Sequence, residues 1–152
     1  MGLLSLPRGA LSGTLAALVM NVPIALQREG GLPAFVAAGA ASGRDPETVS
    51  LRDAAIAHHV AGALAGVLYA ILAGALGRIV GERTARVLAV SGVVVFIDAF
   101  FSKLVFPRFG GEAAADPERA ARTQSAWQRS SFVFGLALYF LAPGGDESGD
   151  DR

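Results

Sequence analysis

The side chain of this sequence that could carry chemistry most readily is the carboxylate of Asp98. It lies in a run of 21 residues, Val87–Pro107, in which Lys103 is the only other charged residue. A carboxylate at the middle of an apolar helix costs roughly 2.5–3.5 kcal/mol on insertion scales, so it usually faces a bundle interior, a water-filled cavity or a partner. Asp98 is therefore interpreted either as a buried hydrogen-bonding group that fixes helix register or as part of a proton or ion pathway.

Lys103 is a poor partner for Asp98 on a regular helix. Five residues correspond to about 140° of rotation and about 7.5 Å of rise, so the two side chains do not face each other. Lys103 is also close to Arg108 in the sequence and can extend its charged end to a membrane interface. We expect Asp98 to find its partner on another helix, and the candidates are Asn21, His58, His59 and Arg129.

Two adjacent histidines, His58 and His59, begin the apolar part of a second helix. Neighbouring residues on a helix point about 100° apart, so the pair cannot easily serve one site. Imidazole titrates near neutral pH, which suits a proton relay or a haem or metal ligand; the alternative is an interfacial histidine at headgroup depth. These are the only two histidines and there is no cysteine, so neither a metal site nor a cofactor is predicted.

The sequence contains no motif of a catalytic or nucleotide-binding site. A nucleophile elbow, a phosphate-binding loop, a dinucleotide fingerprint and a His-Glu-x-x-His motif are all missing. The net charge of zero gives no global field that would attract nucleic acid. We therefore expect a protein that is not an enzyme and does not bind nucleic acid.

Small residues recur every four positions along the helix that follows the histidines. They are Gly62, Gly66, Ala70 and Gly74. Such a ladder allows another helix to approach closely, so it indicates packing, either within the bundle or between protomers. A second surface feature lies later in the chain. It is a basic stripe with a nearby tryptophan: Arg119, Arg122, Arg129 and Trp127. This pattern is typical of a helix that enters through lipid headgroups, and a solvated stripe is the alternative.

The elements that position these residues are apolar helices. Hydrophobic residues make up 53% of the 152, charged residues only 17%, and the charges are segregated. About 20 apolar residues cross a hydrocarbon core of about 30 Å. The sequence predicts an all-α polytopic membrane protein with four transmembrane helices at about 9–27, 54–77, 87–107 and 126–142. A short interfacial helix is predicted at about 33–43, in a single domain 1–143 followed by a disordered acidic tail, 144–152.

Helix caps and a partial repeat add detail to this arrangement. The second helix has two possible starts, an N-cap with a first-turn proline at Asp45-Pro46-Glu47 or a capping box of Ser50 with Asp53, and Asp116-Pro117-Glu118 caps the fourth. Asp-Pro-Glu occurs at both 45–47 and 116–118, and Arg-x-Gly-Gly at both 28–31 and 108–111. The pattern suggests tandem helical hairpins, although chance and shared cap chemistry explain it equally well.

The run GALSGTLAALVMNVP, followed by a loop with a short helix and then AHHVAGALAGVLYAIL, resembles the YagU-type and related small membrane protein families of unknown function. The residues that carry the resemblance are His59, Gly62, Gly66 and Tyr69. The resemblance implies a polytopic membrane protein with cytoplasmic termini and no established activity. Asp98 is not part of it.

Taken together, these features predict a multi-pass protein of the cell membrane whose first partner is the lipid bilayer. The leading hypothesis is a structural or accessory subunit that joins a second copy or another membrane protein through the small-residue face. The alternative is a small oligomeric transporter or proton-linked channel in which Asp98, His58, His59 and Asn21 line the path. A haem-binding or membrane-embedded enzyme is a weaker third hypothesis.

Overall fold

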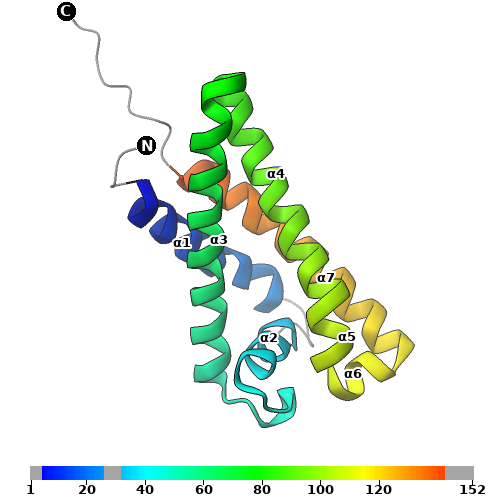
Figure 1. Cartoon of the computed structure of the whole chain (residues 1–152). Helices are drawn as coiled ribbons and strands as arrows, with labels where there is room; N and C mark the ends of the chain where they lie inside the picture. The colour runs from blue at the N-terminus through cyan, green and yellow to red at the C-terminus, as the bar shows by residue number, and fades with distance from the viewer. Residues whose placement is uncertain (1–4, 26–31, 143–152) are drawn as a thin grey trace, which may run out of the picture.

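The protein is a bundle of helices in two crossed layers (Figure 1). The computed structural model describes residues 5–25 and 32–142, and these residues contain no β-strand. The helices are α1 (Ser5–Ala25), α2 (Leu32–Ser42), α3 (Leu51–Val80), α4 (Glu82–Phe100), α5 (Phe106–Phe109), α6 (Gly111–Ala115) and α7 (Pro117–Leu141). A 3₁₀ turn, η1 (Pro46–Thr48), precedes α3, and a π-helical turn, η2 (Phe101–Val105), joins α4 to α5.

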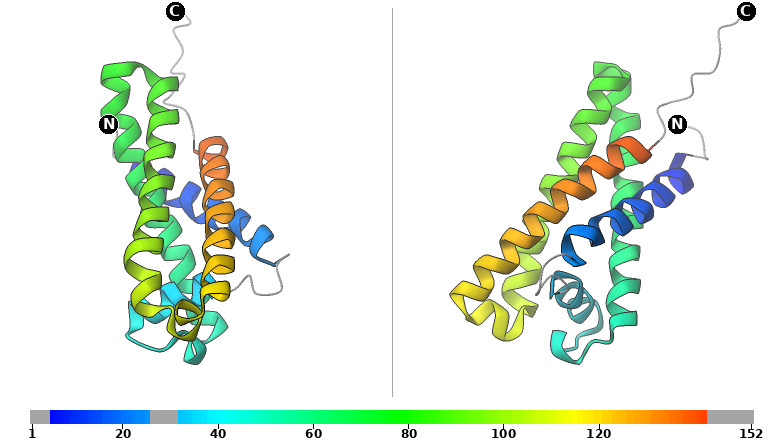
Figure 2. Two further views of the ribbon diagram at one scale, coloured as in Figure 1. Left: turned by 90° about the vertical axis from the view of Figure 1, so that its right-hand side faces the viewer. Right: turned by 180° about the vertical axis from the view of Figure 1, so that it is seen from behind.

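One layer is the long hairpin of α3 and α4, and the other is the antiparallel pair of α1 and α7, which crosses behind it (Figure 2). A hydrogen bond of 3.1 Å from the Ser12 hydroxyl to the Leu141 carbonyl joins the start of α1 to the end of α7. Buried residues from all four helices form the main core, among them Met20, Tyr69, Val93 and Phe134. The four long helices therefore share one core at the crossing point.

The closest helix contact is the crossing of α1 and α3, and it is made through glycines. A Cβ atom added to Gly66 would overlap the carbonyl oxygen of Gly9, and one added to Gly13 would overlap the carbonyl oxygen of Gly62. Backbones approach this closely only when neither residue has a side chain. The small-residue face predicted on α3 is thus occupied by α1 within the same chain at Gly62, Gly66 and Ala70, while Gly74 is half-buried further along.

The predicted caps explain where the helices begin. The Ser50 hydroxyl accepts a hydrogen bond of 3.1 Å from the Asp53 amide at the start of α3, and the Asp116 carboxylate accepts bonds from the Glu118 and Arg119 amides at the start of α7. Asp45 caps only the turn η1. Both capped helices begin before the apolar stretches predicted at 54–77 and 126–142. The reason is that the capping residue, and not the first apolar residue, determines where the first helical turn forms.

Two helical stretches, Leu51–Val80 and Glu82–Phe109, are long and apolar enough to cross a membrane. The described part of α1 contributes a shorter apolar stretch, Leu6–Met20, and α2 another, Pro33–Ser42. The prediction of an all-helical bundle is confirmed, whereas four membrane spans and a hairpin repeat stay predictions. The tail 144–152 lies outside the described residues.

The short helix predicted at 33–43 is present as α2, and it lies against the bundle between the diverging ends of α3 and α4 (Figure 1). Its Val36 side chain is fully buried in a cluster with Phe101, Val105 and Phe106. On α2's other side, Ala38 packs with Val49 and Ala54 at the start of α3. The helix α2 thus separates α3 from the far end of α4.

The glycine crossing predicts a sharp difference between two Gly→Ala substitutions. Gly66→Ala places a methyl group against the Gly9 backbone, and we expect a loss of about 1–3 kcal/mol or more in unfolding free energy because neither backbone can move aside. At Gly92 the nearest atom to an added Cβ is Leu72 Cδ1 at 3.9 Å, so Gly92→Ala should be neutral or stabilising by up to about 1 kcal/mol. Denaturant titration in detergent measures both, and equal losses for the two variants would contradict the crossing.

The cap of α7 predicts an acid-sensitive contribution to stability. The amide hydrogen bond from Arg119, followed by that from Glu118, lowers the pKa of Asp116 below its ordinary value of 3.8. Because the folded-state pKa is the lower one, the contribution is complete above pH 3.8 and is lost as the pH falls through the folded-state pKa. The melting temperature of wild type should therefore fall relative to that of Asp116→Asn, which caps without titrating, only in that acid range. Parallel curves at every pH would contradict this assignment.

Candidate functional site

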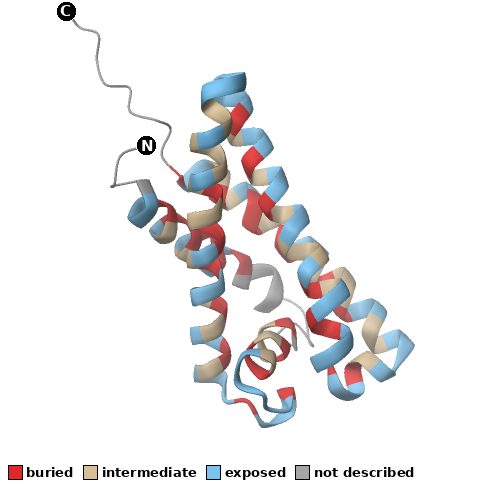
Figure 3. Cartoon of the chain, in the orientation of Figure 1, coloured by how far each residue is buried: buried red, intermediate tan, exposed pale blue. Residues whose placement is uncertain are grey.

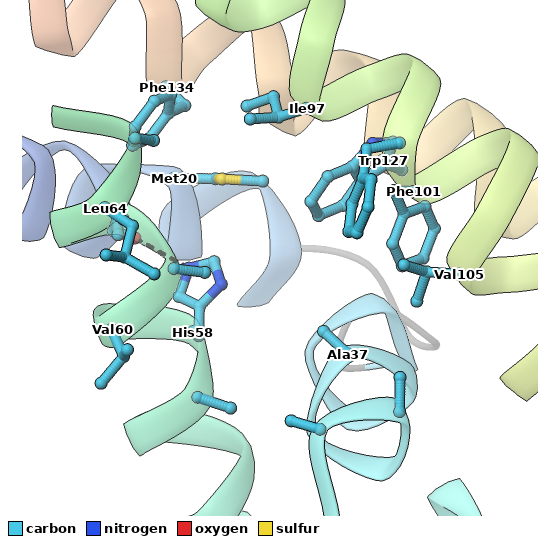
Figure 4. Close-up of a pocket in the computed structure, with 18 of the residues that line it drawn as sticks. Met20, Ala37, His58, Val60, Leu64, Ile97, Phe101, Val105, Trp127 and Phe134 are labelled. Carbon is cyan, nitrogen blue, oxygen red and sulfur yellow. Dashed lines mark hydrogen bonds between the residues drawn. The ribbon is translucent and has the colours of Figure 1, made fainter. Parts of the chain in front are cut away.

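A cavity of about 530 Å³ that could hold a ligand lies between the diverging ends of α3 and α4 (Figure 4). A cavity of this size is within the usual range for small-molecule sites. Its walls come from α1, α2, α3, α4, η2, α5 and α7, and the lining side chains are almost all apolar. His58 is the one titratable residue among them.

The mouth of this cavity opens on the outside of the bundle. Val60 and Leu64 on α3 and Phe100 on α4 line the cavity and are also exposed. Figure 3 shows exposed residues along the outer faces of both helices on either side of the gap. Any ligand that enters between α3 and α4 therefore passes over apolar side chains.

The two histidines have different surroundings. His58 is 8% exposed, and its Nε2 lies 3.1 Å from the Ala17 carbonyl oxygen of α1. This contact lies beside the glycine crossing. His59 is half-buried and its Nδ1 is enclosed without a hydrogen-bond partner. The two rings meet edge-on with centroids 5.8 Å apart, and of the two only His58 lines the cavity.

Asp98 lies on α4, one turn before the π-helical segment. Its Oδ1 atom is enclosed and has no hydrogen-bond partner, and in the described part of the chain Asp98 forms no ion pair. Lys103 is exposed, in agreement with the prediction that the two do not pair. Asp98 is not among the residues that line the cavity with His58.

Among the described side chains, Asp98 and His58 do not line the same cavity, and the predicted path of Asp98, His58, His59 and Asn21 stays a prediction. His58 is held against α1, and Asp98 lies outside the cavity that His58 lines. Asn21 belongs to α1, but its side chain lies outside what the structure describes. Sequence reasoning also missed the enclosed, unpaired hydroxyls of Ser102, Ser130 and Ser131, because a serine in a helix carries no charge signal.

A second polar centre that the sequence analysis missed is Arg86 on α4. Its Nη2 donates hydrogen bonds of 2.7 Å and 3.0 Å to the carbonyl oxygens of Tyr139 and Ala142, at the end of α7. Its Nε lies 3.4 Å from the Tyr69 hydroxyl, and its guanidinium lies 4.9 Å from the centroid of the Tyr139 ring. The last carbonyls of a helix have no partners within that helix, so the arginine closes the end of α7.

The basic stripe on α7 has local partners. The closest nitrogen–oxygen distances are 3.9 Å from Arg119 to Glu112 and 3.5 Å from Arg122 to Glu118, and Arg129 donates to the Ser125 hydroxyl. Exposed pairs of this kind contribute little to stability, so all three arginines can still meet lipid phosphates. Trp127 differs from them, because its ring points inward, stacks on Phe101 at 4.1 Å and lines the cavity.

Comparison with known proteins adds no family: no protein-family model matches the chain, and no curated protein or solved structure matches it. The resemblance to the YagU-type families stays a prediction. The residues themselves therefore carry the functional argument.

The Arg86 contacts predict that Arg86 contributes far more to the unfolding free energy than Arg83, which lies three residues before it. Hydrogen bonds to charged groups contribute about 1.5–3 kcal/mol, so Arg86→Met should lower the unfolding free energy by about that amount. Arg86→Lys should retain only part of the stability, since one ammonium group cannot reproduce the planar fork. The exposed Arg83→Met serves as the control in the same denaturant titration. Equal effects of the two Met variants would contradict the role given to Arg86.

Proposed function

We propose that this chain is a small multi-pass integral membrane protein of the cell membrane, and that it acts as an accessory protein without catalytic activity. The support comes from the outer surface, where large apolar side chains are exposed along α1, α3, α4 and α7. In the two longest apolar helices, only 22% and 17% of the most apolar windows are buried inside the molecule. A core helix of a soluble protein would be mostly buried, so these faces need another apolar environment.

Within the membrane, we propose that the cavity between α3 and α4 takes up one apolar chain of a lipid. The single observation that carries this proposal is the combination of an apolar lining with a mouth bordered by exposed apolar side chains. A lipid tail reaches such a mouth directly from the hydrocarbon region without crossing water. Entry of the tail into the cavity is favoured because it covers the apolar walls. Each Å² removed from water contributes about 25 cal/mol of free energy, and any area that already faces lipid gains packing contacts instead.

In this proposal the accessory protein does not contact its partner through the small-residue face of α3, as the sequence suggested, but through another surface. Gly62 and Gly66 are occupied by α1, so a second copy or another membrane protein has to use an outer face. The exposed Phe96 and Phe100 rings on α4, which stack at 5.9 Å beside the cavity mouth, offer such a face. A bound lipid tail would then contribute to the same contact surface.

The second candidate function is a small cation- or proton-linked transporter. The observation that favours it is Asp98, whose Oδ1 is enclosed without a partner on a helix apolar enough to span a membrane. Ionisable residues in such positions usually mark ion pathways or buried polar networks. The histidines give this candidate less support, since His58 is bonded to α1.

The lipid proposal can be tested with Trp127, which lines the cavity and is the only tryptophan of the chain. The protein is reconstituted into vesicles with and without bromine atoms on the lipid acyl chains, because bromine quenches tryptophan fluorescence at short range. We expect strong quenching of Trp127 in wild type. Ala61→Phe, which fills the cavity mouth, should reduce the quenching, since the tail can no longer enter.

The matched control is Ala75→Phe, an exposed alanine of the same helix that does not line the cavity. It should leave the quenching at the wild-type level. Equal quenching in wild type and Ala61→Phe would mean that bromine reaches Trp127 by another route and would overturn the proposal. Release of the protein from membranes by alkaline carbonate would overturn the membrane assignment itself.

A further inference from the structure

The contact between α4 and α7 has a definite register. Phe101 stacks on Trp127 at 4.1 Å, and a Cβ atom added to Gly135 would meet the side chains of Val94 and Val90. On α7, Trp127 and Gly135 are eight residues apart and lie on one face; on α4, Val94 and Phe101 are seven residues apart and also share a face. The two helices run antiparallel, as the left view of Figure 2 shows.

This register places Asp98 opposite Ser131. Asp98 lies four residues after Val94 on α4, and Ser131 lies four residues before Gly135 on α7, so each is one turn along from the contact that fixes the pairing. Ser131 is 1% exposed, and its hydroxyl oxygen has no hydrogen-bond partner. Ser102 lies four residues after Asp98 and directly follows Phe101, whose ring stacks on Trp127.

Each of these four side chains holds an enclosed polar atom without a hydrogen-bond partner. The atoms are Asp98 Oδ1, Ser102 Oγ, Ser131 Oγ and Trp127 Nε1. Buried polar atoms are normally paired, because an unpaired one costs about 1–3 kcal/mol. In the described part of the chain, Ser130 Oγ and His59 Nδ1 are enclosed and unpaired as well; the atoms that indicate a binding partner at this contact are those of Asp98 and Ser131, which the register brings opposite each other.

The backbone beside Asp98 is also irregular. The Phe101 amide lies between the carbonyl oxygens of Ile97 and Asp98, and the π-helical turn η2 begins at that residue. Single π-helical turns in α-helices occur frequently at functional sites. Here the wider turn contains Ser102 and so shapes one end of the polar contact.

The chemistry of the atoms defines the ligand. Three of the four are oxygens, one of them from a carboxylate, and no nitrogen or sulfur ligand accompanies them; such a set suits a hard cation. A single carboxylate neutralises one positive charge, whereas a divalent ion would leave a net charge in an apolar interior at high cost. Trp127 Nε1 is a donor, so it can bond the carboxylate but cannot bind the cation.

We propose that α4 and α7 enclose a site for a monovalent cation, with sodium as the expected ion, bound by the carboxylate of Asp98 and the hydroxyls of Ser131 and Ser102. Trp127 borders both this site and the apolar cavity, but none of the three cation-binding side chains lines the cavity, and the proposal does not depend on lipid binding or on transport. Its direct effect is to lock α7 onto α4 through a neutral, fully bonded cluster.

The test measures thermal unfolding of the full-length protein in detergent, with sodium chloride replaced by choline chloride at constant ionic strength. A ligand that binds only the folded state raises the melting temperature with its concentration, by roughly 3–5 °C for each tenfold increase above Kd in a chain of this size. We expect this rise for wild type. Asp98→Asn should remove the dependence on sodium, and Ser131→Ala should shift it to higher concentration.

Ser91→Ala, at an exposed position of α4 away from this contact, is the matched control and should behave as wild type. Binding of radioactive sodium to the purified wild type gives a second measurement if Asp98→Asn does not fold. Identical melting in sodium and choline, together with no bound sodium, would overturn the proposal and leave Asp98 as a hydrogen-bonding group. Stabilisation by calcium or magnesium but not by sodium would overturn the assignment to a monovalent ion.

Discussion

The architecture depends on the backbone contact between α1 and α3, where Gly9 and Gly13 meet Gly62 and Gly66. In an apolar environment, where burial of hydrocarbon gives little driving force between helices, close packing at such a crossing is one of the main sources of stability. The crossing holds α1 against the middle of α3, and the Ser12–Leu141 hydrogen bond then aligns α7 beside α1. The far ends of α3 and α4 remain apart, and α2 and the cavity occupy the space between them.

Much of this fold follows from local rules that a sequence expresses directly. The caps at Ser50 and Asp116 start α3 and α7 as predicted, and the spacing of Gly62 and Gly66 identifies the close-packing face of α3. The partner of that face could not be predicted, since a small-residue ladder defines a surface and not what covers it. The same spacing of four at Gly9 and Gly13 on α1 was the available signal.

The polar centres illustrate the opposite case, in which tertiary register decides the role of a residue. Arg86 reads in sequence as a loop charge, and its function becomes visible only when the end of α7 lies beside it. Asp98 stands out by its charge, but Ser131 on α7 comes opposite it only through the pairing of α4 with α7. A π-helical turn likewise escapes prediction, because one extra residue per turn leaves little trace in the hydrophobic pattern.

The Arg86 contacts also bear on the order in which the chain can assemble. The carbonyl oxygens of Tyr139 and Ala142 receive their donors from α4, which is synthesised well before α7. Until α7 arrives, the Arg86 guanidinium lacks two of its acceptors, and α7 without Arg86 ends in unpaired carbonyls that lipid cannot satisfy. The α3–α4 hairpin thus acts as a template that accepts α7 last. A chain truncated before α7 leaves Arg86 with its Tyr69 contact alone, so the missing last helix is exposed as two lost acceptors at one guanidinium.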